Sequence, residues 1–336
     1  MDFGLYLPCY WPDTSIPMQR LYADAVEAAV LAEDSGFNSF SIPEHHFSNA
    51  LVHPEPLLTA IKVASATKRA TISTATTVLP YHEIPKLAGE IAQADCLTDG
   101  RIQIGVGRGA YKYEFDRFRV SQEESGEIFS DSLQLLIKLL SEEEVTWDSK
   151  YYKLPPTTIT PRPVQQPHPP IWFAAVTPGG IDYAVSIGLH VMTTPLRGSF
   201  EKVMAQTDAF FGAMEKYKQP DLKMSMLIMM FVTKDQSDIR RLAELALERH
   251  RRFLNMTTTG GTVKRGAIVP FESDISVEEI EKNLIIGPPE FCIEQLAKYE
   301  ALGIHNLQLN MNFGCGNEDV LGSIERFATH VLPNFA

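Results

Sequence analysis

Short apolar runs alternate with longer amphipathic segments along almost the whole chain. The apolar runs are rich in β-branched, aromatic and Met residues and are bounded by Gly, Pro or Asn, which is typical of strands. Several of them, such as 224–232, are apolar throughout, and this pattern is typical of strands buried on both faces of a parallel sheet. We expect strands at 2–8, 38–43, 70–79, 102–107, 171–176, 189–194, 224–232 and 305–313.

The amphipathic segments predict helices between these strands. We expect helices near 18–35, 55–68, 84–97, 122–141, 180–187, 199–217, 235–254, 288–302 and 317–332. Eight strands that alternate with helices favour an α/β fold of the (β/α)8 TIM-barrel type, with a doubly wound sheet as the competing architecture.

Two stretches are longer than ordinary loops, one Pro-rich at about 142–170 and one at about 255–287 that starts rich in Thr and Gly. Composition does not shift sharply anywhere, so we expect residues 1–336 to form a single domain that carries these two insertions after strands. In a barrel, such insertions commonly form the walls or lid of an active site.

The formal net charge of the 336 residues is −12, and an acidic surface repels phosphate backbones and anionic lipid. We therefore expect no nucleic-acid or membrane partner. The four cysteines are scattered without metal-ligand or redox spacing, which indicates a reduced, cytoplasmic chain. We expect neither a signal peptide nor a membrane span, because no apolar run is long enough and no basic leader precedes the first strand.

The second predicted strand ends in Glu44-His45-His46-Phe47, at the barrel mouth where catalytic groups lie. Because side chains alternate along a strand, only one of the two histidines is expected to face the pocket. A histidine there can act as a general acid or base, and the competing interpretation is a pair of structural histidines bonded to loop carbonyls. We expect no metal, since no third ligand lies nearby in the sequence.

The fourth predicted strand leads into Gly105, Gly107, Arg108 and Gly109. Glycines let a ligand approach the backbone closely, and the fork of donors on Arg108 suits a phosphate. The spacing G-x-G-x-G is not the dinucleotide-binding fingerprint, and no helix clearly begins there. A tight turn with a solvated arginine is the alternative.

The fifth predicted strand ends at Val176 and Thr177, and Gly179 and Gly180 then open a helix. The Thr177 hydroxyl and the backbone N–H groups form a potential anion site at this helix N-terminus, although an ordinary helix cap is the more common case. Together with Arg108 on the adjacent strand, they make a phosphate site more probable than either half does alone.

The chain resembles the bacterial luciferase-like flavin monooxygenases. The motifs that carry the resemblance span nearly the whole length, and their order and spacing agree with the family. They are Phe3-Gly4, Ser35-Gly36-Phe37, Glu44-His45-His46-Phe47, Thr74 to Pro80, Asp99-Gly100-Arg101, Arg108-Gly109-x-Tyr111, Gly287-Pro288-Pro289-Glu290, Gly303-Ile304 and Val331-Leu332-Pro333.

The resemblance implies a barrel that binds reduced FMN at the strand C-termini, commonly as a homodimer, and receives it from a separate NAD(P)H flavin reductase. The reduced flavin and O2 would form a C4a-peroxyflavin that oxygenates a small organic substrate. By position, His45 matches the catalytic histidine of the family. Ala75 and Thr76 match a non-proline cis peptide beneath the flavin, and Glu114 matches an acidic position near the flavin edge.

The resemblance also assigns Arg108 and Thr177 as phosphate ligands, with backbone from Gly179 and Gly180. Two positions depart from luciferase: Gly107 replaces a reactive cysteine, and Gly126 replaces a second phosphate-binding arginine. The first departure argues against light emission with a long aldehyde, and the second predicts weaker or differently arranged phosphate binding. The alternatives are a deazaflavin (F420)-dependent dehydrogenase on the same barrel and a non-catalytic flavin-binding protein.

Overall fold

The computed structural model describes residues 1–195, 199–258 and 260–335. Within them, eight parallel strands pair in the order β1-β2-β3-β5-β8-β9-β10-β14, and β14 pairs with β1, so the sheet closes into a barrel. The strands are β1 (Asp2–Tyr6), β2 (Ser39–Ile42), β3 (Thr71–Thr74), β5 (Ile102–Gly107), β8 (Ile171–Ala174), β9 (His190–Thr193), β10 (Met224–Val232) and β14 (Asn306–Asn310). The predicted TIM-barrel fold is therefore confirmed, and all eight strands lie inside the predicted ranges.

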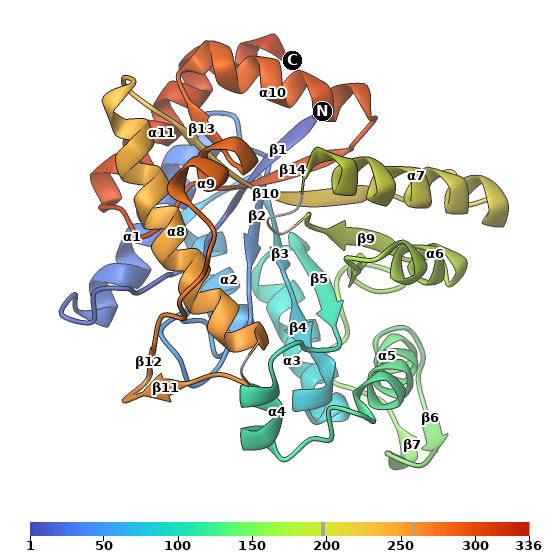
Figure 1. Cartoon of the computed structure of the whole chain (residues 1–336). Helices are drawn as coiled ribbons and strands as arrows, with labels where there is room; N and C mark the ends of the chain where they lie inside the picture. Colours follow the sequence, from blue (N-terminus) through green and yellow to red (C-terminus); the bar gives the residue numbers. More distant parts are fainter. Residues whose placement is uncertain (196–198, 259, 336) are drawn as a thin grey trace.

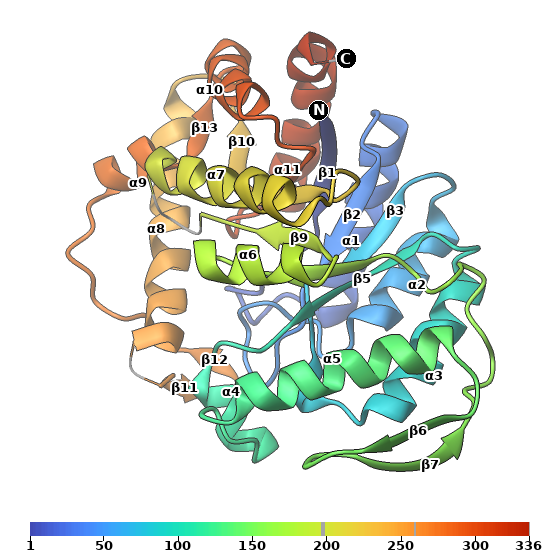
Figure 2. The ribbon, with the colours of Figure 1, turned by 90° about the vertical axis from the view of Figure 1, so that its right-hand side faces the viewer.

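Helices surround the barrel, as Figures 1 and 2 show. Proline occupies the first turn of several of them, where the missing N–H has no intrahelical partner in any case. The helices predicted from the amphipathic segments are α1 (Met18–Asp34), α2 (Pro56–Ala66), α3 (Ile84–Leu97), α5 (Ser125–Ser141), α6 (Pro178–Ser186), α7 (Phe200–Tyr217), α8 (Ser237–Thr258), α10 (Pro289–Ala301) and α11 (Asn317–Arg326).

Several short elements differ from the prediction. A helix does begin soon after the glycine-rich end of β5, because α4 (Lys112–Phe118) starts four residues beyond Arg108. The other additions are β6 (Val145–Asp148), β7 (Lys153–Thr157), β11 (Val263–Lys264), β12 (Ala267–Ile268), α9 (Val277–Asn283), β13 (Ile285–Gly287) and the 3-10 turns Leu79–Tyr81 and Leu332–Asn334. β4 (Thr77–Val78) and the π-helical turn Phe327–Val331 lie within the predicted strand 70–79 and the predicted helix 317–332. The stretches 142–170 and 255–287 thus contain regular structure.

The amino-terminal part of the barrel interior is polar. The Ser41 hydroxyl donates a hydrogen bond to the Gln308 side chain at 2.8 Å, and the Gln308 amide donates to Ser39 Oγ, also at 2.8 Å. Gly4 makes room for this network, since a Cβ there would lie 2.2 Å from Gln308 Nε2. The large apolar cluster instead lies between the strands and the helices, for example where the rings of Phe3 and Phe327 meet edge to face at 5.1 Å.

The carboxyl ends of the barrel strands point away from the end where both chain termini lie (Figure 1). At this mouth, α8 packs against α4 and against the β11–β12 hairpin. The Ile268 N–H of the hairpin donates to Asn49 Oδ1 at 2.9 Å, which ties the hairpin to the loop after β2. No helix in the described ranges has the length and apolarity needed to cross a membrane.

Candidate active site

Glu44, at the carboxyl end of β2, is almost completely buried and accepts several hydrogen bonds. His46 Nε2 lies 2.7 Å from one oxygen, the Val78 N–H donates to the other at 2.8 Å, and His82 Nε2 lies 3.1 Å from both. Burial alone would raise the pKa of Glu44, but the hydrogen bonds and charges of the two histidines outweigh it and lower that pKa. This cluster joins the end of β2 to the segment after β4.

His45 has a different carboxylate partner, Glu114 in the first turn of α4. His45 Nδ1 lies 3.0 Å from Glu114 Oε1, and the His46 N–H donates to the same oxygen at 2.9 Å. Glu114 is 1% exposed, whereas the His45 side chain is 20% exposed. The Tyr111 ring stacks on the imidazole with centroids 4.9 Å apart, so the histidine is held on its edge and on its face.

The hydrogen bond to Glu114 also determines which His45 nitrogen can do chemistry. An ionised carboxylate only accepts hydrogen bonds, so Nδ1 carries the hydrogen. Nε2 is then the nitrogen with a free lone pair, and no group in the described part of the chain is bonded to it. A neutral imidazole held in this tautomer can accept a proton at Nε2 and return it later.

Two adjoining cavities open at the barrel mouth. The first, here called the floor cavity, measures about 480 Å³ and is lined by Ala75, Thr76, Ala174, Val176, Met192 and Thr193 among others. The second, the histidine cavity, measures about 760 Å³ and is lined by residues that include His45, Leu51, Tyr111, Met229, Arg249 and Phe253. Tyr6, Thr194 and Leu227 line both cavities, so the two adjoin.

The Ala75–Thr76 peptide bond is cis, as the resemblance implies. Thr76 also explains why Gly107 lies at the end of β5. A Cβ at position 107 would lie 2.5 Å from Thr76 Oγ1, closer than any side chain can tolerate. The cysteine that luciferase carries at this position therefore has no space here unless the threonine moves.

The predicted phosphate ligands lie on one rim of the barrel. β5 and β8 are paired neighbours, so Arg108 after β5 and Thr177 after β8 follow adjacent strand ends. Arg108 is exposed, and Thr177 is the N-cap of α6, where its hydroxyl accepts from the Gly180 N–H at 3.2 Å. Gly179 lies in the same exposed first turn.

Several residues of the site carried no sequence signal. Arg249 and Phe253 lie in α8, whose many charged residues are typical of a solvated helix. Tyr6 is the last residue of β1, and aromatic residues are common in buried strands generally. Tyr111 belongs to the Arg108-Gly109-x-Tyr111 motif, but its stacking on His45 follows only from the tertiary structure.

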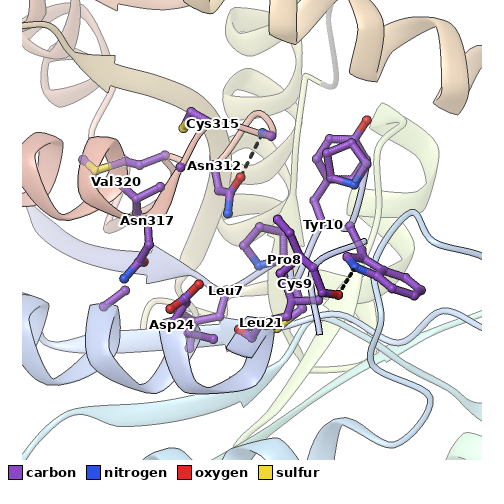
Figure 3. Close-up of a pocket in the computed structure, with 18 of the residues that line it drawn as sticks. Leu7, Pro8, Cys9, Tyr10, Leu21, Asp24, Asn312, Cys315, Asn317 and Val320 are labelled. Atoms are coloured by element: carbon purple, nitrogen blue, oxygen red, sulfur yellow. Dashed lines mark hydrogen bonds between the residues drawn. The ribbon is translucent and has the colours of Figure 1, made fainter. Parts of the chain in front are cut away.

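A third cavity, of about 800 Å³, lies outside the barrel between the segment after β1, helix α1 and the segment that leads into α11 (Figure 3). Two thiols line it, but burial raises the pKa of Cys9 to about 12 and that of Cys315 to about 11. Both remain protonated near neutral pH and are poor nucleophiles. No His, Lys or Arg is among its described lining residues, so we place the chemistry at the barrel mouth.

In the ranges that the structure covers, no group of three or more His, Cys, Asp or Glu side chains has an arrangement that could hold a metal ion. The pair His45–Glu114 has the geometry of a histidine and its orienting carboxylate.

Comparison with known proteins agrees with this fold. The chain is 29% identical to the oxygenase component of a flavin-dependent trigonelline monooxygenase from Acinetobacter baylyi, over 100% of this chain and 96% of that protein. The structure matches monooxygenase RslO1 from Streptomyces bottropensis with a TM-score of 0.88 and 25% identity, over 100% of both chains.

Two further structures share the fold at lower identity. One is the oxygenating constituent of 3,6-diketocamphane monooxygenase from Pseudomonas putida, a type II Baeyer-Villiger enzyme in complex with FMN (TM-score 0.82, 18% identity, 100% and 99% covered). The other is an F420-dependent secondary alcohol dehydrogenase (TM-score 0.77, 20% identity, 100% and 99% covered). At these identities the likeness shows the fold alone. The family model described as luciferase-like monooxygenase matches residues 1–306, and the chain therefore belongs to the luciferase-like monooxygenase family of flavin-dependent oxidoreductases.

Proposed function

We propose that the protein is the oxygenase component of a two-component monooxygenase, which uses reduced FMN and O2 to oxygenate a small organic substrate. The observation that carries the proposal is the placement of His45: its imidazole is oriented by Glu114 and lines a cavity that adjoins the floor cavity. A separate NAD(P)H flavin reductase would supply the reduced flavin, and the trigonelline relative is itself named as an oxygenase component. Assembly as a homodimer stays a prediction.

The described residues fit FMN. Small side chains at Ala75, Thr76 and Val176 leave a flat cavity floor against which a planar ring system can lie. Exposed Arg108 and the N-terminus of α6 offer a charged fork and backbone donors on the same rim, which is the donor set that a phosphate needs. Reduced FMN, when bound, supplies the electrons that activate O2.

The residues of this chain would then perform three tasks. His45 Nε2 would accept and return a proton at the reacting oxygen, and Glu114 would keep its imidazole in the required tautomer. Phe253 on α8 and Tyr111 would exclude water from the histidine cavity, because protons from solvent promote loss of the reduced oxygen as hydrogen peroxide. Residues 255–287 stay our candidate for a lid, with the β11–β12 hairpin as its outer wall.

Single-turnover reactions test this proposal. Full-length protein is mixed with reduced FMN, isotopically labelled O2 and a panel of ketones, aldehydes, amines and aromatic compounds that includes trigonelline. Mass spectrometry is expected to show one labelled oxygen atom in a product. Hydride transfer from reduced F420 without O2, and no labelled product in any reaction, would instead establish the deazaflavin dehydrogenase.

The cofactor site has its own test. Arg108→Ala is expected to weaken FMN binding about ten- to hundredfold, because it removes a charge-assisted contact to the phosphate. Riboflavin lacks the phosphate, so its affinity should be the same in both proteins. Equal FMN affinity in the variant and the parent would remove Arg108 from the site.

A further inference from the structure

Arg249 is a cationic side chain in the wall of the histidine cavity that the proposed proton transfer does not use. Its guanidinium carbon lies 4.3 Å from the ring centroid of Phe253 and 5.7 Å from that of Tyr10. One terminal nitrogen, Nη1, lies 3.6 Å from the Met229 sulfur. Its protein contacts are therefore aromatic rings and a thioether, and it lies in the same cavity as His45.

No carboxylate neutralises Arg249 within the described residues. The Nε–H is buried and has no acceptor, and no ion pair involves this side chain. Two other arginines of α8 differ: Arg252 pairs with Glu248 at 2.9 Å, and Arg241 pairs with Asp319 at 2.9 Å. Arg251 also has a buried Nε–H without an acceptor, but it is not among the residues that line the histidine cavity. Burial lowers the pKa of Arg249 and the nearby tyrosines offset this only in part, yet a guanidinium keeps its proton in proteins.

Arg249 is half-buried, and a charge taken partly out of water without a counter-ion is destabilising unless a ligand supplies the opposite charge. Cation–π contacts with Tyr10 and Phe253 compensate for only part of the lost hydration. The fork of donors matches a carboxylate, with which arginine can form two parallel hydrogen bonds. The proposed FMN phosphate has its own donors at Arg108 and α6, so the flavin does not account for Arg249.

We infer that Arg249 binds the carboxylate of a planar aromatic substrate in the histidine cavity. This inference rests on the proposed function, since it names the substrate class for that same site. The rings of Tyr6, Tyr111 and Phe253 line the cavity and favour a flat, unsaturated molecule. A carboxylate bound to Arg249 anchors the substrate in the cavity that His45 lines.

The test compares acids with their uncharged amides, which have nearly the same shape. Calorimetric titration of the full-length protein, with and without FMN, uses benzoate against benzamide and nicotinate against nicotinamide. We expect at least one carboxylate to bind about ten- to hundredfold more tightly than its amide. Arg249→Met should abolish this preference, and Arg249→Lys should keep part of it.

Arg240→Met is the matched control, because it removes a cation from the same helix at an exposed position paired with Glu278. It should keep the preference for the acid. The comparison of acids with amides in the parent protein tests the inference even if Arg249→Met fails to fold. Equal affinities in the parent protein, or no binding of any carboxylate, would overturn the inference.

Two further results would separate a failure of this inference from a failure of the proposed function. If Arg249→Met weakens the binding of reduced FMN but keeps the preference for the acid, the arginine serves the flavin and the inference is wrong. If the parent protein prefers the acid but yields no oxygenated product with reduced FMN and O2, the inference stands and the proposed function fails.

Discussion

The two buried carboxylates beside the histidine pair, Glu44 and Glu114, show how one short motif produces two different environments. Glu44 is 2% exposed and Glu114 is 1% exposed, and each hydrogen-bonds a histidine from the end of β2. Glu44 also accepts from the Val78 N–H and lies against His82, so its oxygens are saturated by groups that join two loops.

Glu114 holds His45 by one ring nitrogen and leaves the other nitrogen available in the wall of the histidine cavity. The residue types and the burial of the carboxylates are nearly the same in the two clusters. What differs is whether the histidine reaches a space large enough for a ligand. The comparison teaches that access to a cavity, and not the histidine–carboxylate pair itself, separates the site proposed for chemistry from one that supports the fold.

The largest effect is expected from His45→Ala. A positioned histidine typically contributes about 10²–10⁴-fold to proton-transfer steps, so product formation should fall by that factor while reduced flavin is diverted to hydrogen peroxide. Flavin binding and the fold should be kept, since the side chain lies in a cavity wall. The measurement is the yield of product and of peroxide in single turnovers.

His46→Ala is the matched comparison, because it removes the neighbouring histidine that bonds to Glu44. It should lower thermal stability and leave the ratio of product to peroxide unchanged. The assignment of His45, and not His46, to the cavity is wrong if His46→Ala lowers the ratio of product to peroxide while His45→Ala keeps it. Both histidines are structural if neither variant changes the ratio.

Glu44→Ala should give the next largest effect, which is a loss of stability of the folded protein. It leaves His46, His82 and the Val78 N–H without their acceptor, and breaking such a buried pair typically lowers the free energy of unfolding by about 3–5 kcal/mol. Glu44→Gln retains one acceptor oxygen and should lose about 1–3 kcal/mol. Urea unfolding measures both, and equal stability of parent and Glu44→Ala would show that the cluster does not support the fold.

Glu114→Gln should mainly reduce turnover. The amide can bond to His45 but cannot stabilise the imidazolium form, so loss of a charge-assisted contact should reduce kcat about ten- to hundredfold. The KM for the substrate should change little, because Glu114 does not line either cavity at the mouth. Steady-state kinetics with excess reductase distinguish the two parameters. A change confined to KM would place Glu114 in substrate binding instead.

The barrel could be predicted from the sequence because its strands are short and apolar and its main helices are long and amphipathic. The elements that were missed are short: α4 has seven residues and β13 has three. Such segments contain too few residues to show the hydrophobic period of 3.6 that marks a helix or of 2 that marks a strand. β13 forms only because the edge of β10 is available to pair with it.

The site residues likewise include some that could be predicted from the sequence and some that could not. His45 could be proposed from its place at a strand end, because alternation and barrel topology restrict where its side chain points. Arg249 could not, because α8 contains several arginines and only the tertiary structure separates the one that lines the cavity from the others. The pairing of His45 with Glu114 joins residues 69 positions apart, and local pattern cannot reveal such a contact.

The smallest predicted effect is a pH dependence that belongs to the Glu44 cluster alone. Burial opposes protonation of His82, but its hydrogen bond and charge interaction with Glu44 outweigh burial, so the pKa of His82 is raised above 6.5. Its contribution to stability is therefore complete below about pH 6.5 and is lost as the pH rises through the raised pKa. The pKa of Glu44 is lowered, so its contribution is complete above 4.5 and is lost as the pH falls through the lowered value.

The parent protein should thus lose stability as the pH rises from 6.5 through the raised pKa of His82. His82→Gln removes the titrating group and should flatten this part of the profile, whereas His330→Gln, at an exposed position, should leave it unchanged. Urea midpoints measured from pH 5 to 9 test this difference. Identical slopes for the parent and His82→Gln would show that the cluster does not hold a protonated histidine, and the contrast between Glu44 and Glu114 would then rest on cavity access alone.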